Sequence, residues 1–460
     1  MRYYVFTFDG YGLPIAHRLQ REGHEVVVAQ VEDQGQVLSE LEQGLPDEDA
    51  ESKQRRLSLY DGLLDKRPAD KVMEDLRRGR KKDAFVFFDL NHLFRYAEEV
   101  EELGYHGNFP RGDDYILEID RERAKSFVGD NYPMVRVGEN HRFDRAAQAK
   151  RFLKNTDELW VLKGIQEDAR TVVPNTDDVA LAQNQILDAL EKDLETYESA
   201  GFILEKKITP ALEYTPERLY YDGRLVATLL VIENKDLGAG NVGPQTDCSQ
   251  DLVFLIEDDC KIARMAFPPI VDEMAKAHRG LFLWDASLYV DPRTGRAYFG
   301  EFCANRPGYN SLYNQISLAG SASRLFESAV EGKAPYPVNE VGTSVRIFNL
   351  HQSEGRPLAG AAVEILPEVE QNLFLVDVRQ KSRRLATAGY KDTLGVAVGS
   401  GHSVSEAARA AHRAIGGLSF EGAFYRPYFD LISRDYRTSI VNRIDYGLQL
   451  GYYKVGFGLS

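Results

Sequence analysis

The chain has 460 residues, more than one hydrophobic core usually holds, so about two to four domains are expected. Its formal net charge is −15, and 28% of its residues are charged. An acidic surface excludes nucleic acid as the main partner, because phosphate binding needs a basic face. The one basic cluster, at 77–82, is short and indicates a solvated helix end or loop.

The cysteine count and the hydropathy pattern favour a cytoplasmic protein. Cys248, Cys260 and Cys303 are the three cysteines, and their spacing fits no metal motif. An odd, low count indicates a reducing compartment and no zinc site. No run approaches the roughly 18 apolar residues of a membrane span, and the N-terminus lacks a signal peptide's cleavage site. We therefore expect no membrane partner.

The first segment alternates strands and helices, which predicts a parallel α/β domain over residues 1–112. Apolar runs predict strands at 3–8, 25–31 and 83–90. Gly10 and Gly12 follow the first strand, and we interpret them as a tight strand-to-helix turn in preference to a cofactor loop. Helices are expected after this turn and at 92–104, with a polar loop at 44–56.

The remainder predicts an α+β organisation in two further domains, at 113–335 and 336–460. Helical patterns occur at 113–128 and 178–198, with antiparallel strands between and after them, and a linker at 331–342. Strands are expected near 343–350 and 373–378. A last helix begins at Ser403, which forms a capping box with Glu406, and stops at Gly416 and Gly417.

Lys163 lies in an apolar strand that is followed by a polar turn at 166–170. A buried ammonium must meet an anion, so such a strand could cover nucleotide phosphates. On this stretch alone a strand-edge lysine that reaches solvent is favoured about two to one, because buried lysines are rare. In the next strand region Glu205 or Glu213 could accept hydrogen bonds from an adenine amino group or a ribose. A solvated loop is the favoured alternative there.

A predicted hairpin carries the remaining candidates. Asp285 and Glu301 lie at the far ends of two strands joined by a turn at 291–295, so we expect them to come close in space. Two adjacent carboxylates repel unless a cation or a shared proton relieves them. Together with Asn305 they offer the oxygen ligands that Mg²⁺ prefers. Alternatively one of the carboxylates faces outward, since hairpin register cannot be read from the sequence.

These segments, in this order, resemble the ATP-grasp enzymes, and within them the phosphoribosylamine–glycine ligases. The stretch "WVLKGIQEDARTVV" is similar to the strand with the ATP lysine, "FILEKKI" to the adenine-contacting hinge, and "GEFCANRPG" to the metal-binding segment. The most specific likeness is 388–427, which ends "FEGAFYRP" and is similar to the C-terminal domain of these ligases. The resemblance covers nearly the whole chain and implies the ATP-grasp fold.

The resemblance also implies a reaction: a carboxylate attacks the γ-phosphate of Mg·ATP, and an amine then attacks the acyl phosphate to give an amide, ADP and phosphate. Small-molecule acids and amines would be the partners, Mg²⁺ or Mn²⁺ the metal, and a monomer or homodimer the assembly. The implied metal ligands are Asp285, Glu301 and Asn305. Lys163 and Arg306 would hold the phosphates and the reacting carboxylate. The implied nucleotide-binding residues are Arg121, Lys163, Glu205, Lys206, Ile208 and Glu213.

The sequence departs from the family pattern at several of these positions. Arg121 stands at the ATP-binding helix lysine, Cys303 at the metal asparagine, and "DGYGLP" replaces the family's phosphate turn. The substrates are therefore expected to differ from phosphoribosylamine and glycine of purine biosynthesis. An alternative is a non-catalytic paralogue that keeps the fold as a nucleotide-binding or scaffolding module. Retention of Lys163 with the carboxylates opposes it, since a scaffold has no need of buried charges.

Overall fold

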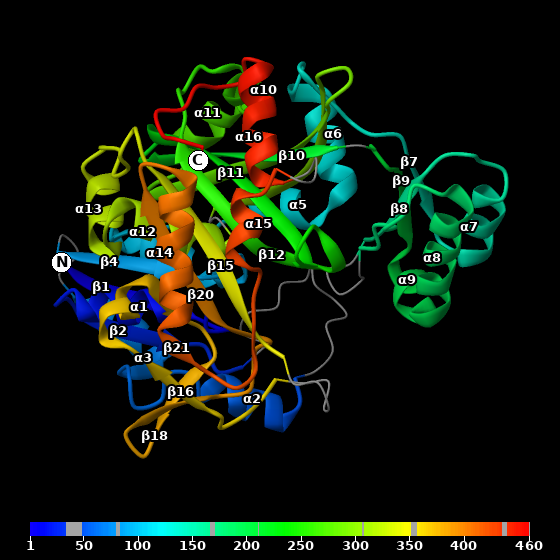
Figure 1. Ribbon diagram of the computed structural model, residues 1–460. Coiled ribbons are helices and arrows are strands. Elements are labelled where there is room, and N and C mark those ends of the chain that lie inside the picture. Colours follow the sequence, from blue (N-terminus) through cyan, green and yellow to red (C-terminus); the bar gives the residue numbers. More distant parts are fainter. Residues whose placement is uncertain are drawn as a thin grey trace.

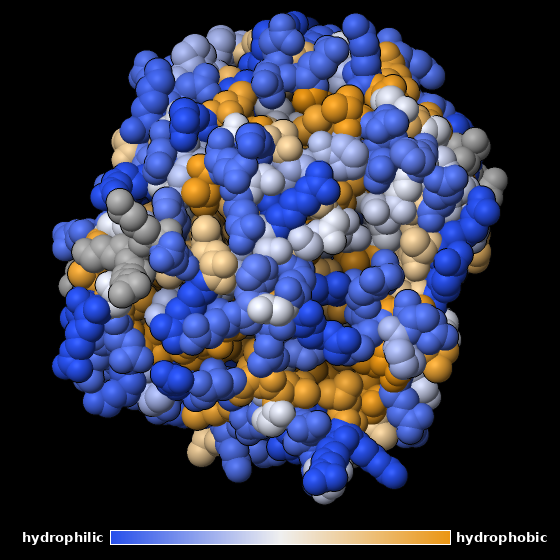
Figure 2. All heavy atoms as spheres, turned by 90° about the vertical axis from the view of Figure 1, so that its left-hand side faces the viewer, coloured by the Kyte–Doolittle hydropathy of each residue, from blue (hydrophilic) through white to orange (hydrophobic). Residues whose placement is uncertain are grey.

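The computed structural model describes residues 1–33, 48–79, 83–165, 171–209, 211–305, 308–350, 357–434 and 439–459. These residues form a parallel sheet, a large mixed sheet and two small antiparallel sheets, with helices on their faces (Figure 1). No helix in these ranges combines the length and the apolar character that a membrane span requires. Hydrophilic residues cover most of the side on which the N terminus lies, with apolar patches exposed between them (Figure 2).

The first segment forms the predicted parallel sheet, with strand order β3-β2-β1-β4-β5. The central strand β1 is buried on both faces, which explains its continuous apolar run: Tyr3 and Val5 join one core cluster, and Tyr4 and Phe6 join another. The elements are β1 (Arg2–Thr7), α1 (Leu13–Arg21), β2 (Glu25–Gln30), α2 (Ala50–Leu57), β3 (Lys66–Pro68), α3 (Ala69–Arg78), β4 (Ala84–Phe88), η3 (Asn91–Leu93), α4 (Phe94–Leu103) and β5 (His106–Gly107).

The glycine turn after β1 is tight, as its sequence predicts. Gly10 has a φ of +94°, and a Cβ atom on Gly12 would lie 2.8 Å from Cγ1 of Val5. The Gly12 amide donates to Oδ2 of Asp89 at 2.8 Å. The loop predicted at 44–56 is wrong in its second part, since Asp49 caps α2 by accepting from the Ser52 amide. Residues 44–47 lie outside the described residues.

Two single helices predicted from the sequence are each divided. The pattern at 113–128 becomes α5 (Gly112–Ile119) and α6 (Arg121–Asn131), because Asp120 is extended and its Oδ1 accepts from the amides of Glu122 and Arg123. The pattern at 178–198 becomes α8 (Val179–Lys192) and α9 (Leu194–Ala200), which meet at Asp193. In both places an aspartate ends one helix and precedes the next.

Residues 140–165 and 171–206 form a lobe that stands apart from the rest of the described chain (Figure 1). A three-stranded antiparallel sheet, in the order β7-β9-β8, packs against three helices around its own apolar core. Lys163 lies on β8, and Glu205 lies on β9 beside it. The elements are β7 (Asn140–Phe143), α7 (Ala146–Leu153), β8 (Trp160–Gly164), α8, α9 and β9 (Phe202–Lys206).

A large sheet unites the middle and the end of the chain in the order β17-β20-β15-β12-β11-β10-β13-β14-β6. It crosses the boundary proposed near residue 335, because β15 pairs with β12 on one side and β20 on the other. Its strands are β6 (Val135–Arg136), β10 (Leu212–Tyr221), β11 (Arg224–Gly238), β12 (Val242–Leu255), β13 (Leu281–Asp291), β14 (Arg296–Ala304), β15 (Val341–Asn349), β17 (Leu373–Leu375), β20 (Thr393–Gly401) and β22 (Ala423–Phe424), the last pairing with β15.

Helices cover this sheet, and the segments between its last strands contribute to a four-stranded sheet in the order β18-β19-β16-β21. The predicted capping box of α14 is confirmed in part: the Ser403 hydroxyl accepts from the Glu406 amide, while Glu406 accepts from the amide of His402. The remaining elements are α10 (Lys261–Ala266), α11 (Pro269–Ala277), α12 (Tyr309–Ala319), α13 (Ala322–Val330), β16 (Ala362–Ile365), η4 (Pro367–Asn372), β18 (Val378–Lys381), β19 (Arg384–Thr387), α14 (Val404–Gly416), β21 (Leu418–Ser419), α15 (Tyr428–Ile432) and α16 (Ile440–Gln449).

A buried ion pair fastens the C-terminal segment to the β11–β12 hairpin. Arg426, from the "FEGAFYRP" stretch, pairs with Asp430, and both side chains are 0% exposed. Arg426 also donates to the Asp236 carbonyl and to Oδ1 of Asn241, each at 2.8 Å. Asp430 accepts from the Gly240 amide at 3.0 Å. Arg426 therefore has a structural role, which is to hold the C-terminal segment against strands β11 and β12.

Replacing Arg426 by methionine should lower the free energy of unfolding by about 3–5 kcal/mol, because Asp430 is left buried without its cation. Chemical denaturation followed by circular dichroism measures the change. The double variant Arg426→Met/Asp430→Leu should recover most of the loss. Arg434→Met, which removes an exposed pair with Asp445, should cost less than about 1 kcal/mol. A single Arg426 variant as stable as the wild type would contradict this account.

A second test concerns His17, which packs edge-on against Tyr60. Burial, with a smaller effect of Arg21 and Arg18, lowers the pKa of His17 to about 4. The unfolded chain, with a pKa near 6.5, therefore binds more protons between pH 4 and 6.5, so stability falls as the pH decreases through this window. His17→Gln should reduce that fall by about 1–2 kcal/mol in denaturation curves between pH 6.5 and 4.5. The exposed His402→Gln variant should keep the wild-type slope.

Candidate active site

The β13–β14 hairpin turns Asp285 toward one face of the large sheet. Asp285 lies directly opposite Cys303 on β14 and opposite Glu217 on β10, and facing residues of antiparallel strands point to the same side. Asp285 is 4% exposed, and its Oδ1 accepts from the Cys303 amide at 2.9 Å. The position that the ATP-grasp pattern gives to a metal-binding asparagine is thus filled by a cysteine beside Asp285.

Asp285 and Glu217 form a buried pair of carboxyl groups beneath α12. The Ser311 hydroxyl donates to Glu217 at 3.0 Å, and the Gln315 amide donates to it at 2.5 Å. Burial nevertheless raises the pKa of Glu217 to about 8. Burial, and after it the neighbouring Glu217, raises the pKa of Asp285 well above its ordinary value. The pair therefore holds a proton or requires a cation at neutral pH.

Lys235 on β11 joins the other carboxylates of this face. Its Nζ lies 2.8 Å from Glu213 and 3.2 Å from Glu301, and the Ser287 hydroxyl donates to Glu213 at 2.7 Å. Burial lowers the pKa of Lys235, but Glu213 and Glu301 outweigh this effect and raise it. Lys235, and then Arg121 and Lys163, lower the pKa of Glu301. These groups are therefore near enough to act on one another.

Two buried lysines share a single carboxylate between the lobe and α6. Glu205 lies 2.6 Å from Nζ of Lys125 and 3.2 Å from Nζ of Lys163. All three residues are less than a tenth exposed, so the alternatives of a solvent-reaching Lys163 and a solvated Glu205 are wrong. Burial outweighs Glu205 and lowers the pKa of Lys125, and the two lysines outweigh burial and lower the pKa of Glu205. One positive charge is left over, which suits an incoming anion.

The other nucleotide-binding predictions fall in different surroundings. The Lys206 side chain points away from Lys163, toward an exposed ion pair with Glu158 at 2.7 Å. Ile208 follows β9 and is half-buried. Arg306 and the turn at 166–170 lie outside the described residues.

Asn305 ends the hairpin in the left-handed conformation, with a φ of +66°. Its backbone amide donates to the Leu283 carbonyl at 2.8 Å, so it lies two residue pairs beyond Asp285 and Cys303. The side chain is 3% exposed and lines a small cavity with Leu219 and Leu283. Neither polar atom of this side chain has a hydrogen-bond partner among the described residues. That it reaches a metal ion stays a prediction.

Arg346 adds a buried cation to the face. It lies two residues after Ser344, which is opposite Asp251 of β12, and it is 3% exposed. Its guanidinium lies 4.7 Å from the ring centre of Tyr309. Within the described residues, Nε and Nη2 find no hydrogen-bond partner, and the carboxylate of Asp247, an exposed side chain, lies 3.6 Å away. Arg346 therefore has hydrogen-bond donors to spare.

Sequence reasoning missed Lys125, Lys235 and Glu217. Lys125 lies one helical turn after Arg121, so the helix spacing could have identified it. Lys235 lies within "VIENKD", a stretch that the family resemblance already includes. Glu217 carries no sequence signal of its own, because its role comes from facing Asp285 across two strands.

The carboxylates suit a magnesium ion that enters with a nucleotide. Within the ranges that the structure describes, no three His, Cys, Asp or Glu side chains are grouped to hold a metal by themselves. Mg²⁺ commonly takes one or two protein carboxylates and completes its shell with phosphate oxygens and water. Asp285 and Glu301 offer this number, and a cation beside Asp285 and Glu217 would favour the ionised carboxylates that burial disfavours.

Comparison with known proteins identifies the fold of the chain. No family model matches the sequence, and no curated protein does. Among solved structures, a phosphoribosylamine–glycine ligase from Thermotoga maritima superposes with a TM-score of 0.63 at 16% identity, covering 93% of this chain and 99% of that one.

Biotin carboxylases have the same architecture. A complex from Campylobacter jejuni gives a TM-score of 0.59 at 13% identity over 92% of this chain and 93% of that one. The biotin carboxylase domain of a Hydrogenobacter thermophilus 2-oxoglutarate carboxylase, solved with MgADP and bicarbonate, gives 0.56 at 12% identity over 99% and 96%. Each superposition spans more than nine-tenths of this chain and of the other. The chain therefore has the ATP-grasp fold, as its sequence resemblance implied.

Proposed function

We propose that this chain is an ATP-dependent, ADP-forming ligase that joins a carboxylate to an amine. The observation that carries the proposal is the buried Lys125–Glu205–Lys163 group, whose surplus positive charge lies near Glu301. Lysines on one side and carboxylates on the other complement a nucleotide whose phosphates bring a divalent cation. A fold shared with a phosphoribosylamine–glycine ligase supports this reaction class.

In this proposal the lobe and α6 hold the nucleotide. Lys163 and Lys125 bind phosphate oxygens, with Arg121 close enough to add to the potential. Glu205 keeps both lysines in place. The backbone at Lys206 and Ile208 pairs with the adenine edge, and Glu213 takes the ribose hydroxyls. Magnesium bound at Asp285 and Glu301, with Asn305 as a further proposed ligand, would neutralise charge on the phosphates.

The chemistry needs alignment and charge neutralisation more than covalent help from the protein. A carboxylate oxygen of the acid forms a bond to the γ-phosphorus while the bond to the ADP oxygen breaks. The amine nitrogen then forms a bond to the acyl carbon, phosphate leaves, and the nitrogen loses a proton. Lys163 stabilises the transferring phosphoryl group, and Arg306 is proposed to grip the acid. Arg346, with unused donors, is a second candidate for that carboxylate.

The acid and the amine are proposed to differ from glycine and phosphoribosylamine. The turn that contains Gly10 and Gly12 carries Tyr11, whose ring stacks on Tyr309 with a centroid distance of 4.1 Å. Nζ of Lys391 lies 3.9 Å from the centre of the Tyr11 ring on this turn. Two packed aromatic rings occupy the region of the family's phosphate turn, which leaves less open backbone for a phosphate.

Lys163→Met should weaken Mg·ATP binding about 10- to 100-fold, because one charge-assisted contact to phosphate is lost. The fold should persist, since Lys125 remains to pair with Glu205. Isothermal titration calorimetry with Mg·ATP measures the effect. The exposed lysine of the same lobe gives a control, and Lys154→Met should bind as the wild type does. If neither the wild type nor the Lys154 variant binds nucleotide, the chain is a scaffolding module and the proposal fails.

Glu301→Gln should reduce ADP formation at least about 100-fold while leaving the melting temperature nearly unchanged, because the side chain is 45% exposed. Coupled ADP assays should start with Mg·ATP, glycine and freshly generated phosphoribosylamine, and should then screen acids and amines by mass spectrometry. Glu331→Gln, at an exposed helix end, is the matched control. An unaltered rate in the Glu301 variant would overturn its assignment. ATP binding without turnover on glycine would point to other substrates.

A further inference from the structure

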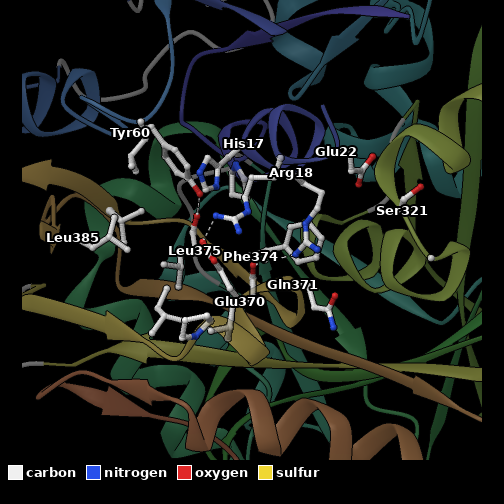
Figure 3. A pocket seen from close by; sticks show the side chains of 18 residues that line it. His17, Arg18, Glu22, Tyr60, Ser321, Glu370, Gln371, Phe374, Leu375 and Leu385 are labelled. Carbon is white, nitrogen blue, oxygen red and sulfur yellow. Dashed lines mark hydrogen bonds and ion pairs between the residues drawn. The ribbon is translucent and has the colours of Figure 1, made fainter. Parts of the chain in front are cut away.

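A second cavity lies away from the proposed ligase site, between α1 and the C-terminal strands (Figure 3). Its volume is about 360 Å³, within the range of small-molecule sites. Side chains of α1 and Tyr60 form one wall, and residues of η4 and β17 face them from the other. No residue proposed to bind the nucleotide, the metal or the substrates lines it, so its occupant is a separate ligand.

Arg18 is the charged group of this cavity that keeps unused N–H donors. Its Nη2 donates to the Leu373 carbonyl at 3.4 Å, and its guanidinium lies 4.7 Å from the centre of the Phe374 ring. Within the described residues, no carboxylate lies at ion-pair distance from Arg18, and these two contacts leave most of its five N–H groups available. A guanidinium in this state can bind an anion bidentately.

The other charged groups of the lining are already paired. Arg21 forms an ion pair with Glu370 at 2.5 Å. Glu22 accepts from the backbone amides of Ala322 and Ser323, each at 2.9 Å, at the first turn of α13. Burial lowers the pKa of His17 to about 4, so this residue is neutral at physiological pH. Arg18 therefore dominates recognition of charge inside the cavity.

The rest of the wall is mixed, because Ser321 and Gln371 line it together with aliphatic side chains. The Tyr60 hydroxyl is occupied, since it donates to the Leu375 carbonyl. The aliphatic residues gather on the side of the C-terminal strands, where Ile365, Val378 and Leu385 line the cavity. This aliphatic side of the cavity accommodates a hydrocarbon body. A guanidinium with free donors that faces an aliphatic wall suits an amphipathic anion.

We propose that this cavity binds a small carboxylate with a hydrocarbon or aromatic body, the carboxylate on Arg18 and the body against the C-terminal strands. A cavity of this volume has room for a carboxylic acid of about eight carbons. The ligand would contact α1 and β17 together, so its binding should stabilise the junction between the two ends of the chain.

Octanoate is the probe, and the intact chain is titrated by calorimetry and followed by thermal shift. Octanoate should bind with a dissociation constant of about 1 mM or tighter and raise the melting temperature in proportion to its concentration. Octylamine and octanol, which keep the hydrocarbon and lose the negative charge, should bind at least about tenfold more weakly. Arg18→Gln should weaken octanoate binding about tenfold or more.

Arg21→Gln is the matched control, because Arg21 is on the same helix but already engaged by Glu370; it should keep octanoate affinity within about threefold. Circular dichroism and thermal denaturation without ligand establish that each variant is folded. No heat and no thermal shift with octanoate would overturn the proposal, as would equal affinity for octanol or unchanged affinity in the Arg18 variant. These outcomes do not depend on ligase activity, so the two proposals fail or stand separately.

Discussion

Charge balance on one face of the large sheet is the constraint on which the site depends. Strands β10, β12 and β13 turn Glu217, Asp251 and Asp285 toward the same side, where α12 buries them. The helix supplies neutral hydrogen-bond donors: the Gln315 side-chain amide donates to Glu217, and the Asn314 side-chain amide donates to Asp251 at 2.7 Å. Neutral donors satisfy hydrogen bonds without cancelling charge, so the face must take up protons or a cation.

The lobe has the opposite imbalance. Glu205 is outnumbered by Lys125 and Lys163, which are held in a low-dielectric setting where a phosphate is attracted strongly. A nucleotide with its divalent cation is negative at the phosphates and positive at the metal, so it meets both needs at once. Lys235 between Glu213 and Glu301 balances part of the intervening region. The protein without ligand can thus fold, while the carboxylate face still favours a cation and the Lys125–Glu205–Lys163 group still favours an anion.

How far the sequence predicts this structure depends on the range of the interaction. Local signals were sufficient for the parallel sheet, the Gly10 turn and the cap at Ser403, since each is decided by a few neighbouring residues. The ion pair of Lys163 with Glu205 was not predictable, because it needs the β8–β9 register that sets Lys163 opposite Ile203. Lys125 needed no such register, since it lies one helical turn after Arg121 within α6 and the spacing alone could have identified it.

The polar residues at the end of the hairpin show the same limit. Periodicity places Asn305 on the face of Asp285, yet its left-handed backbone and the small cavity beside Leu283 decide where the amide lies. A motif match gives the residue type and the approximate place, but not the direction of a side chain. The family pattern was therefore a good guide to the fold and a weaker guide to the individual ligands.

Close packing also connects the Arg18 cavity with the turn that contains Gly10 and Gly12. The Phe374 ring stacks on the Tyr313 ring with centroids 4.6 Å apart, and the Arg18 guanidinium lies over the same Phe374 ring. The Tyr313 hydroxyl in turn donates to the Tyr11 carbonyl at 2.6 Å. A carboxylate on Arg18 and a substrate beside Tyr11 would therefore act on one aromatic stack. Linkage requires any such effect to be reciprocal: the factor by which one ligand changes the affinity of the other is the same in both directions. Contact alone does not fix the size of that factor. Coupling requires that the aromatic stack has two arrangements and that each ligand binds more tightly to one of them.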